Sequence, residues 1–292
     1  MKLKSPPDDN AMVAMKNDII PTLAKLGLSE SRLFQYCLAH YDSRGGENHT
    51  FEARVEDLRK FFYIDRSRAY TVVREAMIKL SARPLEISAG NKELFEHWFT
   101  GFSYFRGEGR FEFRLNKEAE PYFLALKKFF TRYRLSATKK FKKAASFKLY
   151  INLKQWENTG RWEVELDELK YRLGVAGKYS AWDSLKQWII VPTVNEINEH
   201  SDITVKWKPT KTGRRVTGVA FKIREKSKTA VQNAREVHEA NQLLKAAEEE
   251  KKKRLGTTMG STSIDVGFKK TRWPLNRFIQ RTVKPGLFRA GI

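Results

Sequence analysis

The sequence lacks what disulfide frameworks, multi-cysteine metal centres and membrane spans require. A single cysteine, Cys37, excludes a disulfide within the chain and any metal site built from several cysteines. The apolar runs are short, such as the four residues from Trp188 to Val191. None approaches the roughly 18 residues that a membrane helix needs. The first residues, which include Pro6 and Pro7, contain no apolar signal core. We therefore expect a protein of the cytoplasm with no membrane partner.

Catalytic and metal-binding patterns are also missing. The five histidines include no pair at metal-ligand spacing, which disfavours a metal centre and a metal-assisted nucleophile. Asp65, Asp167 and Asp202 are scattered and suit helix caps or turns. The segment at 174–180 resembles a phosphate loop only superficially, because no Ser or Thr directly follows Lys178 and a helix precedes it. We predict no enzyme activity, no cofactor and no metal.

Positive charge is in large excess and is unevenly placed. The 292 residues carry 56 basic and 34 acidic groups, for a net charge of +22. Residues 1–130 contribute +3, residues 131–225 contribute +10 and residues 226–292 contribute +9. A folded chain this basic requires a polyanionic partner, nucleic acid first and an acidic membrane surface second.

One segment concentrates this charge. Between Glu120 and Glu157 there is no acidic residue, and ten basic residues are interleaved with aromatic ones. The segment includes Lys148 and the aromatic residues Tyr133, Phe141 and Phe147. A solvated protein face usually mixes charges of both signs, so we predict that this segment contacts phosphates.

Hydrophobic spacing predicts helices and strands in two successive groups. In the first group, Ser29 caps a helix in which Cys37 is buried, and Pro84 ends a long helix. The first group comprises a helix from Ser29, a strand at 50–54, helices at 55–62 and 66–82, and strands within 85–115 with a turn at 107–109. The second comprises a helix at 144–156, a strand at 162–165, helices at 167–173 and 180–198, the latter capped by Ser180, and a hairpin of 203–208 with 216–223.

The two groups align with each other. Residues 55–64 match residues 166–175, and with one insertion Val73 and Met77 match Leu185 and Ile189. Both groups have the order helix, strand, helix, turn, helix, hairpin, which is that of a winged helix-turn-helix. We predict an α+β fold of tandem winged-helix domains with a basic C-terminal tail.

Four regions follow from this pattern. They are a flexible N-terminus (1–10), a first winged helix (11–130), a second winged helix (131–225) and a tail (226–292). In the tail, a helix at 227–255 and a Gly/Ser/Thr linker precede a basic stretch at 268–292. That stretch is either an arm that orders on binding or an unstructured end.

DNA-contacting residues are predicted from the last helix of each domain, from the hairpin of the second domain and from basic residues elsewhere, including the acid-free segment. On the second-domain helix, Leu185 and Ile189 match buried positions, so Ser184, Lys186 and Gln187 should face outward. Gln pairs with adenine and Lys with guanine in the major groove, although a merely solvated surface is the alternative. Backbone contacts are expected from Lys139, Lys140, Lys142, Lys143, Lys178, Lys208, Lys211, Arg214 and Arg215 in the second domain, and from Arg66, Arg68 and Arg74 in the first.

Aromatic residues crowd residues 94–115 of the nearly charge-balanced first domain. They are Phe95, Trp98, Phe99, Phe102, Tyr104, Phe105, Phe111 and Phe113. Alternate residues of a strand point to opposite faces, so one face of a small sheet cannot bury them all. Most should fill the domain's own core, and some should be available for pairing with a second copy.

From about Ala11 to Glu225 the chain resembles the iteron-binding plasmid replication initiators, which have two winged-helix domains. The resemblance rests on motifs in a fixed order, among them 16–19 (KNDI), 104–107 (YFRG), 121–124 (PYFL), 130–133 (FTRY), 148–150 (KLY), 167–169 (DEL), 173–175 (LGV), 196–198 (EIN) and 211–214 (KTGR). In that family the second winged helix reads the repeat, and the first contacts adjacent DNA and dimerises. One departure is that only Lys186 supplies a basic residue on the first turns of the second-domain helix, where members often place several.

The resemblance also implies partners. Monomers of the family open the origin, dimers often repress their own promoter, and a host replication initiator and helicase take part. We therefore predict a DNA-binding initiator of plasmid replication, dimeric when free and monomeric on its direct repeats. A transcriptional repressor without origin activity is the alternative. An RNA-binding protein is third, because the major groove of RNA is too narrow to be read by a helix.

Overall fold

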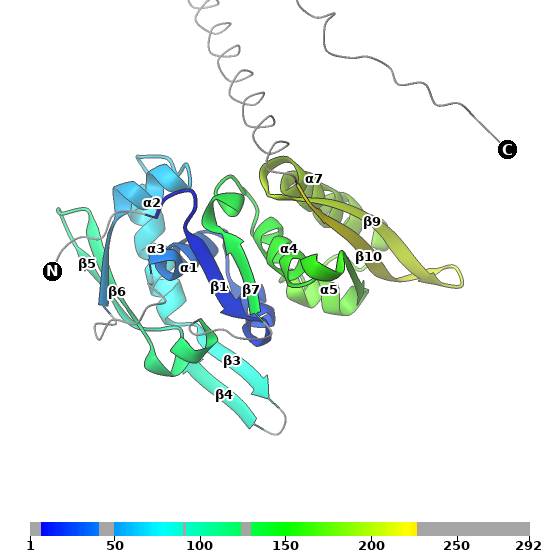
Figure 1. Cartoon of the computed structure of the whole chain (residues 1–292), viewed down its shortest axis with the longest axis horizontal. Coiled ribbons are helices and arrows are strands. Elements are labelled where there is room, and N and C mark those ends of the chain that lie inside the picture. Colours follow the sequence, from blue (N-terminus) through cyan, green and yellow to red (C-terminus); the bar gives the residue numbers. More distant parts are fainter. Residues whose placement is uncertain (1–6, 41–49, 90–91, 124–129, 227–292) are drawn as a thin grey trace, which may run out of the picture. The chain divides into compact units, whose positions relative to one another are not determined.

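The computed structural model describes residues 7–40, 50–89, 92–123 and 130–226 (Figure 1). The predictions for residues 1–6, for the loop at 42–49 and for the tail from residue 227 onward lie outside these ranges.

The first winged helix combines three helices with a three-stranded sheet. Its strands are antiparallel in the order β2–β6–β5, and Phe111 and Phe113, two residues apart on β6, are both buried. Its elements are α1 (Leu28–His40), β2 (Thr50–Arg54), α2 (Val55–Phe61), α3 (Ala69–Ser81), β5 (Phe99–Phe105) and β6 (Arg110–Leu115).

The second winged helix repeats the same order. Its sheet is β8–β10–β9, so in both domains the strand after the first helix pairs with the second strand of the hairpin. Its elements are α4 (Ala144–Gln155), β8 (Arg161–Glu165), α5 (Leu166–Arg172), α6 (Trp182–Leu185), a π-helical turn η5 (Lys186–Ile190), α7 (Val191–His200), β9 (Ile203–Thr212) and β10 (Arg215–Glu225).

The duplication extends to the backbone after the second helix of each domain. Tyr63 and Gly174, which the sequence alignment places together, both have positive φ, 51° and 71°. In each copy the next amide N–H closes the same turn: Ile64 N donates to Arg59 O and Val175 N to Lys170 O, both at 2.9 Å. The predicted tandem winged-helix fold is confirmed at this level of detail.

Further elements lie outside the winged-helix pattern. Strand β1 (Met12–Lys16) pairs antiparallel with β7 (Phe130–Arg134), a pairing that bridges the predicted domain boundary at 130/131. The predicted strands at 85–115 form two hairpins in separate sheets, the first being β3 (Pro84–Ala89) with β4 (Lys92–His97). Short 3-10 helices complete the described chain: η1 (Asn17–Lys25), η2 (Lys117–Tyr122), η3 (Leu135–Thr138) and η4 (Glu157–Thr159).

Three local predictions are wrong. Helix α1 begins at Leu28, so Ser29 lies inside it and caps nothing. The helix predicted from Ser180 begins at Trp182, because Tyr179 has a positive φ of 54° and turns the chain just before it. Strand β9 continues through Pro209 to Thr212, which is possible because β9 is an edge strand and a missing N–H costs least there.

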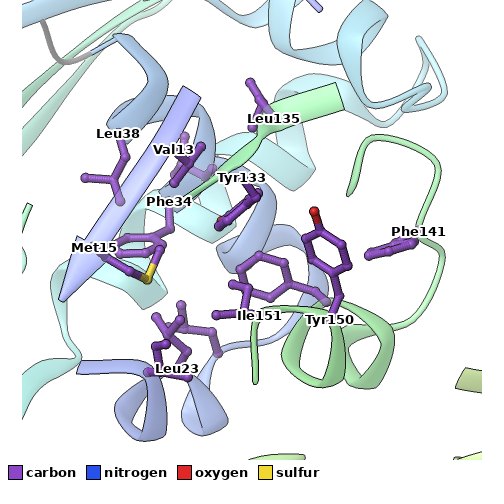
Figure 2. Close-up of a cluster of buried hydrophobic side chains, with 14 of the residues drawn as sticks. Val13, Met15, Leu23, Phe34, Leu38, Tyr133, Leu135, Phe141, Tyr150 and Ile151 are labelled. Carbon is purple, nitrogen blue, oxygen red and sulfur yellow. The ribbon is translucent and has the colours of Figure 1, made fainter. Parts of the chain in front are cut away.

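Helix α4 is the central helix of the core. All residues from Ser146 to Leu153 are buried, as in a helix that is covered on every side. Figure 2 shows Tyr150 and Ile151 of α4 facing a cluster that includes Val13 of β1 and Tyr133 of β7. The Tyr150 ring lies 5.5 Å from that of Tyr133 and 5.7 Å from that of Phe141, both edge-on. The second winged helix therefore shares a core with the strand pair β1–β7.

Candidate nucleic-acid interface

The predicted DNA-reading helix is one continuous helix with a π turn inside it. We call residues 182–200, which comprise α6, η5 and α7, the reading helix; its junctions at Lys186 and Val191 keep right-handed helical backbone angles. Pro192 lies two residues after Ile190, the last residue of the π turn. A proline ring clashes with the carbonyl four residues earlier in a regular helix, and the wider turn gives that carbonyl of Trp188 room.

The π turn changes which side chains face outward. Leu185 is fully buried as predicted, but the next fully buried residue is Ile190, five positions on, and Ile189 is only half-buried. The prediction that Ile189 takes the matching buried position of Met77 is therefore off by one residue. The cause is the extra residue that a π turn adds to a 3.6-residue period.

Of the three predicted base-reading residues, Lys186 and Gln187 are exposed and Ser184 is half-buried. The structure adds Trp188, whose side chain is 62% exposed, and the exposed Asn195 further along α7. Neither residue was predicted as a contact; for Trp188 the reason is that a Trp beside two Ile residues is typical of a buried run. The proline that follows is the sequence signal that could have indicated the change of phase.

The hairpin tip of the second domain carries the predicted cations. We call Lys208, Lys211, Arg214 and Arg215, around Gly213, the wing. All four residues are exposed, and none of their side chains has a hydrogen bond or ion pair with any residue in the described part of the chain. Gly213 has φ of 59°, which closes the tip. Four like charges so close together favour an anionic partner.

The other predicted backbone contacts fall into two groups. Lys142, Lys143 and Lys178 are exposed, whereas Lys139 and Lys140 are half-buried. Lys139 Nζ lies 2.7 Å from Asp9 Oδ1, so its charge already has a partner within the chain.

The acid-free segment is also part core. Lys148 is only 6% exposed, and Tyr133, Phe141 and Phe147 are 1% exposed, so the predicted phosphate contact does not extend to these four residues. Tyr133 and Phe141 lie in the core that the second winged helix shares with β1–β7 (Figure 2). Phe147 and Lys148 are buried residues of α4 itself.

In the first domain, Arg66, Arg68 and Arg74 are all exposed, just before α3 and in its first turns. Asp65 orders the turn before this helix by accepting a hydrogen bond from Ser67 N at 2.9 Å, as its predicted turn role requires. Tyr70, 47% exposed, projects from the same end of α3.

The predictions about membrane spans and metal ligands can be compared with the described residues. In these ranges no helix is long and apolar enough to cross a membrane, and no three His, Cys, Asp or Glu side chains gather as metal ligands. Cys37 is buried as predicted, and this burial raises the pKa of its thiol.

Comparison with known proteins agrees with this architecture. Residues 12–154 match the family described as "Initiator Replication protein, WH1", and residues 165–223 match "Initiator Rep protein, WH2". A "Replication initiation protein" of Escherichia coli is 29% identical over 166 residues, which are 55% of this chain and 51% of that protein. The chain thus spans about half the length of that relative. An "Uncharacterized 27.6 kDa protein" of Escherichia coli is 23% identical over 218 residues, 69% of this chain and 91% of that one.

A solved structure shares the fold. The crystal structure of Pi initiator protein in complex with iteron DNA matches with a TM-score of 0.67 at 22% identity, covering 74% of this chain and 98% of that one. The two family matches together cover more than half of the chain; the first extends from β1 through most of α4, and the second begins at the end of β8 and runs into β10. The chain therefore belongs to the family of initiator replication proteins with two winged-helix domains.

Proposed function

We propose that this chain initiates plasmid replication by binding direct repeats of origin DNA. The observation that carries the proposal is the second domain, where an exposed polar stretch of the reading helix is combined with a wing of four cations that have no partner among the described residues. The likeness in fold to an initiator solved with iteron DNA supports it. DNase footprinting on the replicon's own DNA tests it. Protection of tandem direct repeats is expected, whereas protection of one inverted repeat would favour a repressor.

The proposed mechanism is binding without bond chemistry. Cations of the wing and of α3 neutralise phosphates and release counterions, which supplies affinity without sequence preference. Lys186 and Gln187 offer donors and acceptors to base edges in the major groove, which supplies sequence preference. A host replication initiator and helicase would act after this step in the cytoplasm; the family resemblance supports their involvement.

Replacing Gln187 with alanine should lower discrimination at one base pair by roughly 1–3 kcal/mol, because a bidentate amide contact is lost. Affinity for random duplex DNA should stay unchanged. Competition binding with single-base variants of the repeat measures this. Asn158→Ala, which removes an exposed amide from η4, is the matched control. Equal losses on repeat and random DNA would remove Gln187 from base recognition.

We further propose that the free protein dimerises through the first domain and binds one repeat as a monomer. Of the eight aromatic residues at 95–113, only Phe95 is mostly exposed, at 64%. Its position on β4, a strand with one free edge in a two-stranded sheet of the described chain, supports pairing with a second copy. The charge balance of residues 1–130 is compatible with protein contact.

Light scattering should report a dimer for the free protein and one subunit per single-repeat duplex. Phe95→Lys should shift the free protein toward monomer, because it places a charge in the apolar contact. The control Ile78→Ser removes a similarly exposed apolar side chain, 55% exposed, from α3 of the same domain. A wild-type protein that stays monomeric at high micromolar concentration would refute the dimer, as would two subunits on one repeat.

A further inference from the structure

We propose that Lys148 is a positioning residue that fixes the two winged helices relative to each other, so that both engage a single DNA repeat. The proposal rests on the function proposed above and adds a residue that touches no DNA. It starts from a lysine of the acid-free segment whose ammonium group is buried and donates to two backbone carbonyls.

The Lys148 ammonium joins two helix ends. From the centre of α4, Nζ donates to Ala24 O at 2.6 Å and to Leu173 O at 3.3 Å. Ala24 lies in the last turn of η1, which follows β1, and Leu173 is the C-terminal cap of α5. The last carbonyls of a helix lack partners within the helix and carry partial negative charge, so a cation between two such ends satisfies both.

The neighbouring glycine makes this approach possible. A Cβ built on Gly174 would lie 2.3 Å from Ala24 O and 2.4 Å from Lys148 Nζ. No side chain fits at position 174. The turn after α5 therefore needs a glycine if η1 and the Lys148 ammonium are to contact it. The last turn of η1, which precedes the first winged helix, and the end of α5 in the second winged helix therefore meet at this turn, with the Lys148 ammonium between them.

Burying the Lys148 ammonium costs desolvation free energy, which indicates that the cation has a specific role at this position. Burial lowers the pKa of Lys148 to about 8, an effect that Glu30 opposes and Arg83 and Lys178 reinforce. Glu30 itself is already paired, with Oε2 lying 2.7 Å from Arg83 Nε. An apolar side chain would fill the space without this desolvation cost, whereas only a donor can hold both carbonyls in register.

The contact lies where it can set the position of the reading helix. Only residues 174–181 lie between the end of α5 with its cap and the start of the reading helix. The position of α5 therefore fixes where the reading helix begins. Without the ammonium, η1 and α5 lose their shared partner and the domains gain freedom to pivot. When one domain is bound to a repeat, a loosened connection lowers the effective concentration of the other domain at its part of the same repeat.

The experiment compares Lys148→Met and the shorter Lys148→Gln with Lys154→Met. Lys154, on the same helix, also has a 6% exposed side chain, but it pairs with Glu157 and Asp202 of the second domain. Two different replacements of Lys148 ensure a result even where one of them folds poorly. All proteins are full-length, and each is first checked for cooperative melting.

Domain geometry is measured by spin labels at Glu75→Cys in α3 and Asp167→Cys in α5, whose side chains are 57% and 99% exposed. The native thiol, Cys37, is buried and takes no label. Electron–electron resonance should give one narrow distance distribution for wild type and Lys154→Met, and a broad one for both Lys148 variants. A distribution as narrow in the Lys148 variants as in wild type would overturn the proposal.

DNA binding supplies the functional readout. On a duplex with one whole footprinted repeat, the Lys148 variants should bind roughly tenfold more weakly, whereas binding to the half contacted by the second domain should change less than about twofold. Equal losses on whole and half repeats would overturn the positioning role. A wild-type protein that binds no repeat would instead refute the proposed function, and the distance measurement would still decide the role of Lys148.

Discussion

Replacing Gly174 with alanine is expected to destabilise the chain by roughly 2–5 kcal/mol. About 1–2 kcal/mol comes from the left-handed backbone, with φ of 71°, and about 1–3 kcal/mol comes from overpacking. The overpacking arises because the new Cβ would lie 2.3 Å from Ala24 O, a backbone atom that cannot rotate away. Urea denaturation followed by circular dichroism measures the free energy of unfolding.

Gly177→Ala separates the two contributions. Gly177 has nearly the same φ, 73°, but a Cβ added to it would meet no atom of the described chain within 4 Å. Its replacement should therefore cost only the backbone part, about 1–2 kcal/mol. Equal losses in the two variants would show that η1 does not press on the α5 turn.

Tyr63 shows why sequence comparison could not reveal this contact. It occupies the matching position of the first domain with φ of 51°, yet it carries a large side chain that is 63% exposed. The left-handed turn alone therefore does not demand glycine. Glycine is required in the second copy because Ala24 of η1, far earlier in the chain, lies against it. Only a tertiary contact distinguishes the two positions.

Local patterns were sufficient for most of the fold. Apolar spacing and the internal alignment predicted the helix and strand order of both winged helices, because each element buries one face of its own. The strand pair β1–β7 was not predicted as a pair, since it joins segments that lie far apart in the sequence. Periodicity carries no information about such a partner.

The cations of the candidate interface could be predicted from the sequence. The faces that the side chains of the reading helix occupy could be predicted less well. Wing residues such as Lys211 and Arg214 are exposed because a glycine turn projects them. The predicted phase of the reading helix is wrong at Ile189 because the helix contains a π turn at 186–190, and a fixed period of 3.6 residues cannot anticipate the extra residue. Lys148 was predicted to contact phosphates with the rest of the acid-free segment, although the apolar residues that predominate around it within 146–153 are typical of a fully buried helix.

Removing two wing cations is expected to weaken binding to every duplex and to change its salt dependence. In Lys211→Ala/Arg214→Ala, the slope of log affinity against log salt should become shallower by about 1.8, which is 0.9 for each lost phosphate contact. Between about 50 and 200 mM salt, the variant should therefore lose roughly tenfold less affinity than wild type loses. Repeat and random duplexes should respond alike, because phosphates carry no sequence information.

The matched control removes two cations from the same hairpin but away from its tip. Lys206 and Lys222 face each other directly across β9 and β10 and are both exposed, so Lys206→Ala/Lys222→Ala makes the same change in net charge. If the wing itself lies along the DNA backbone, this control should leave the slope near the wild-type value. Fluorescence anisotropy titrations across a salt series measure both slopes. Equal slopes for the two double variants would mean that overall charge, and not the wing, attracts the DNA.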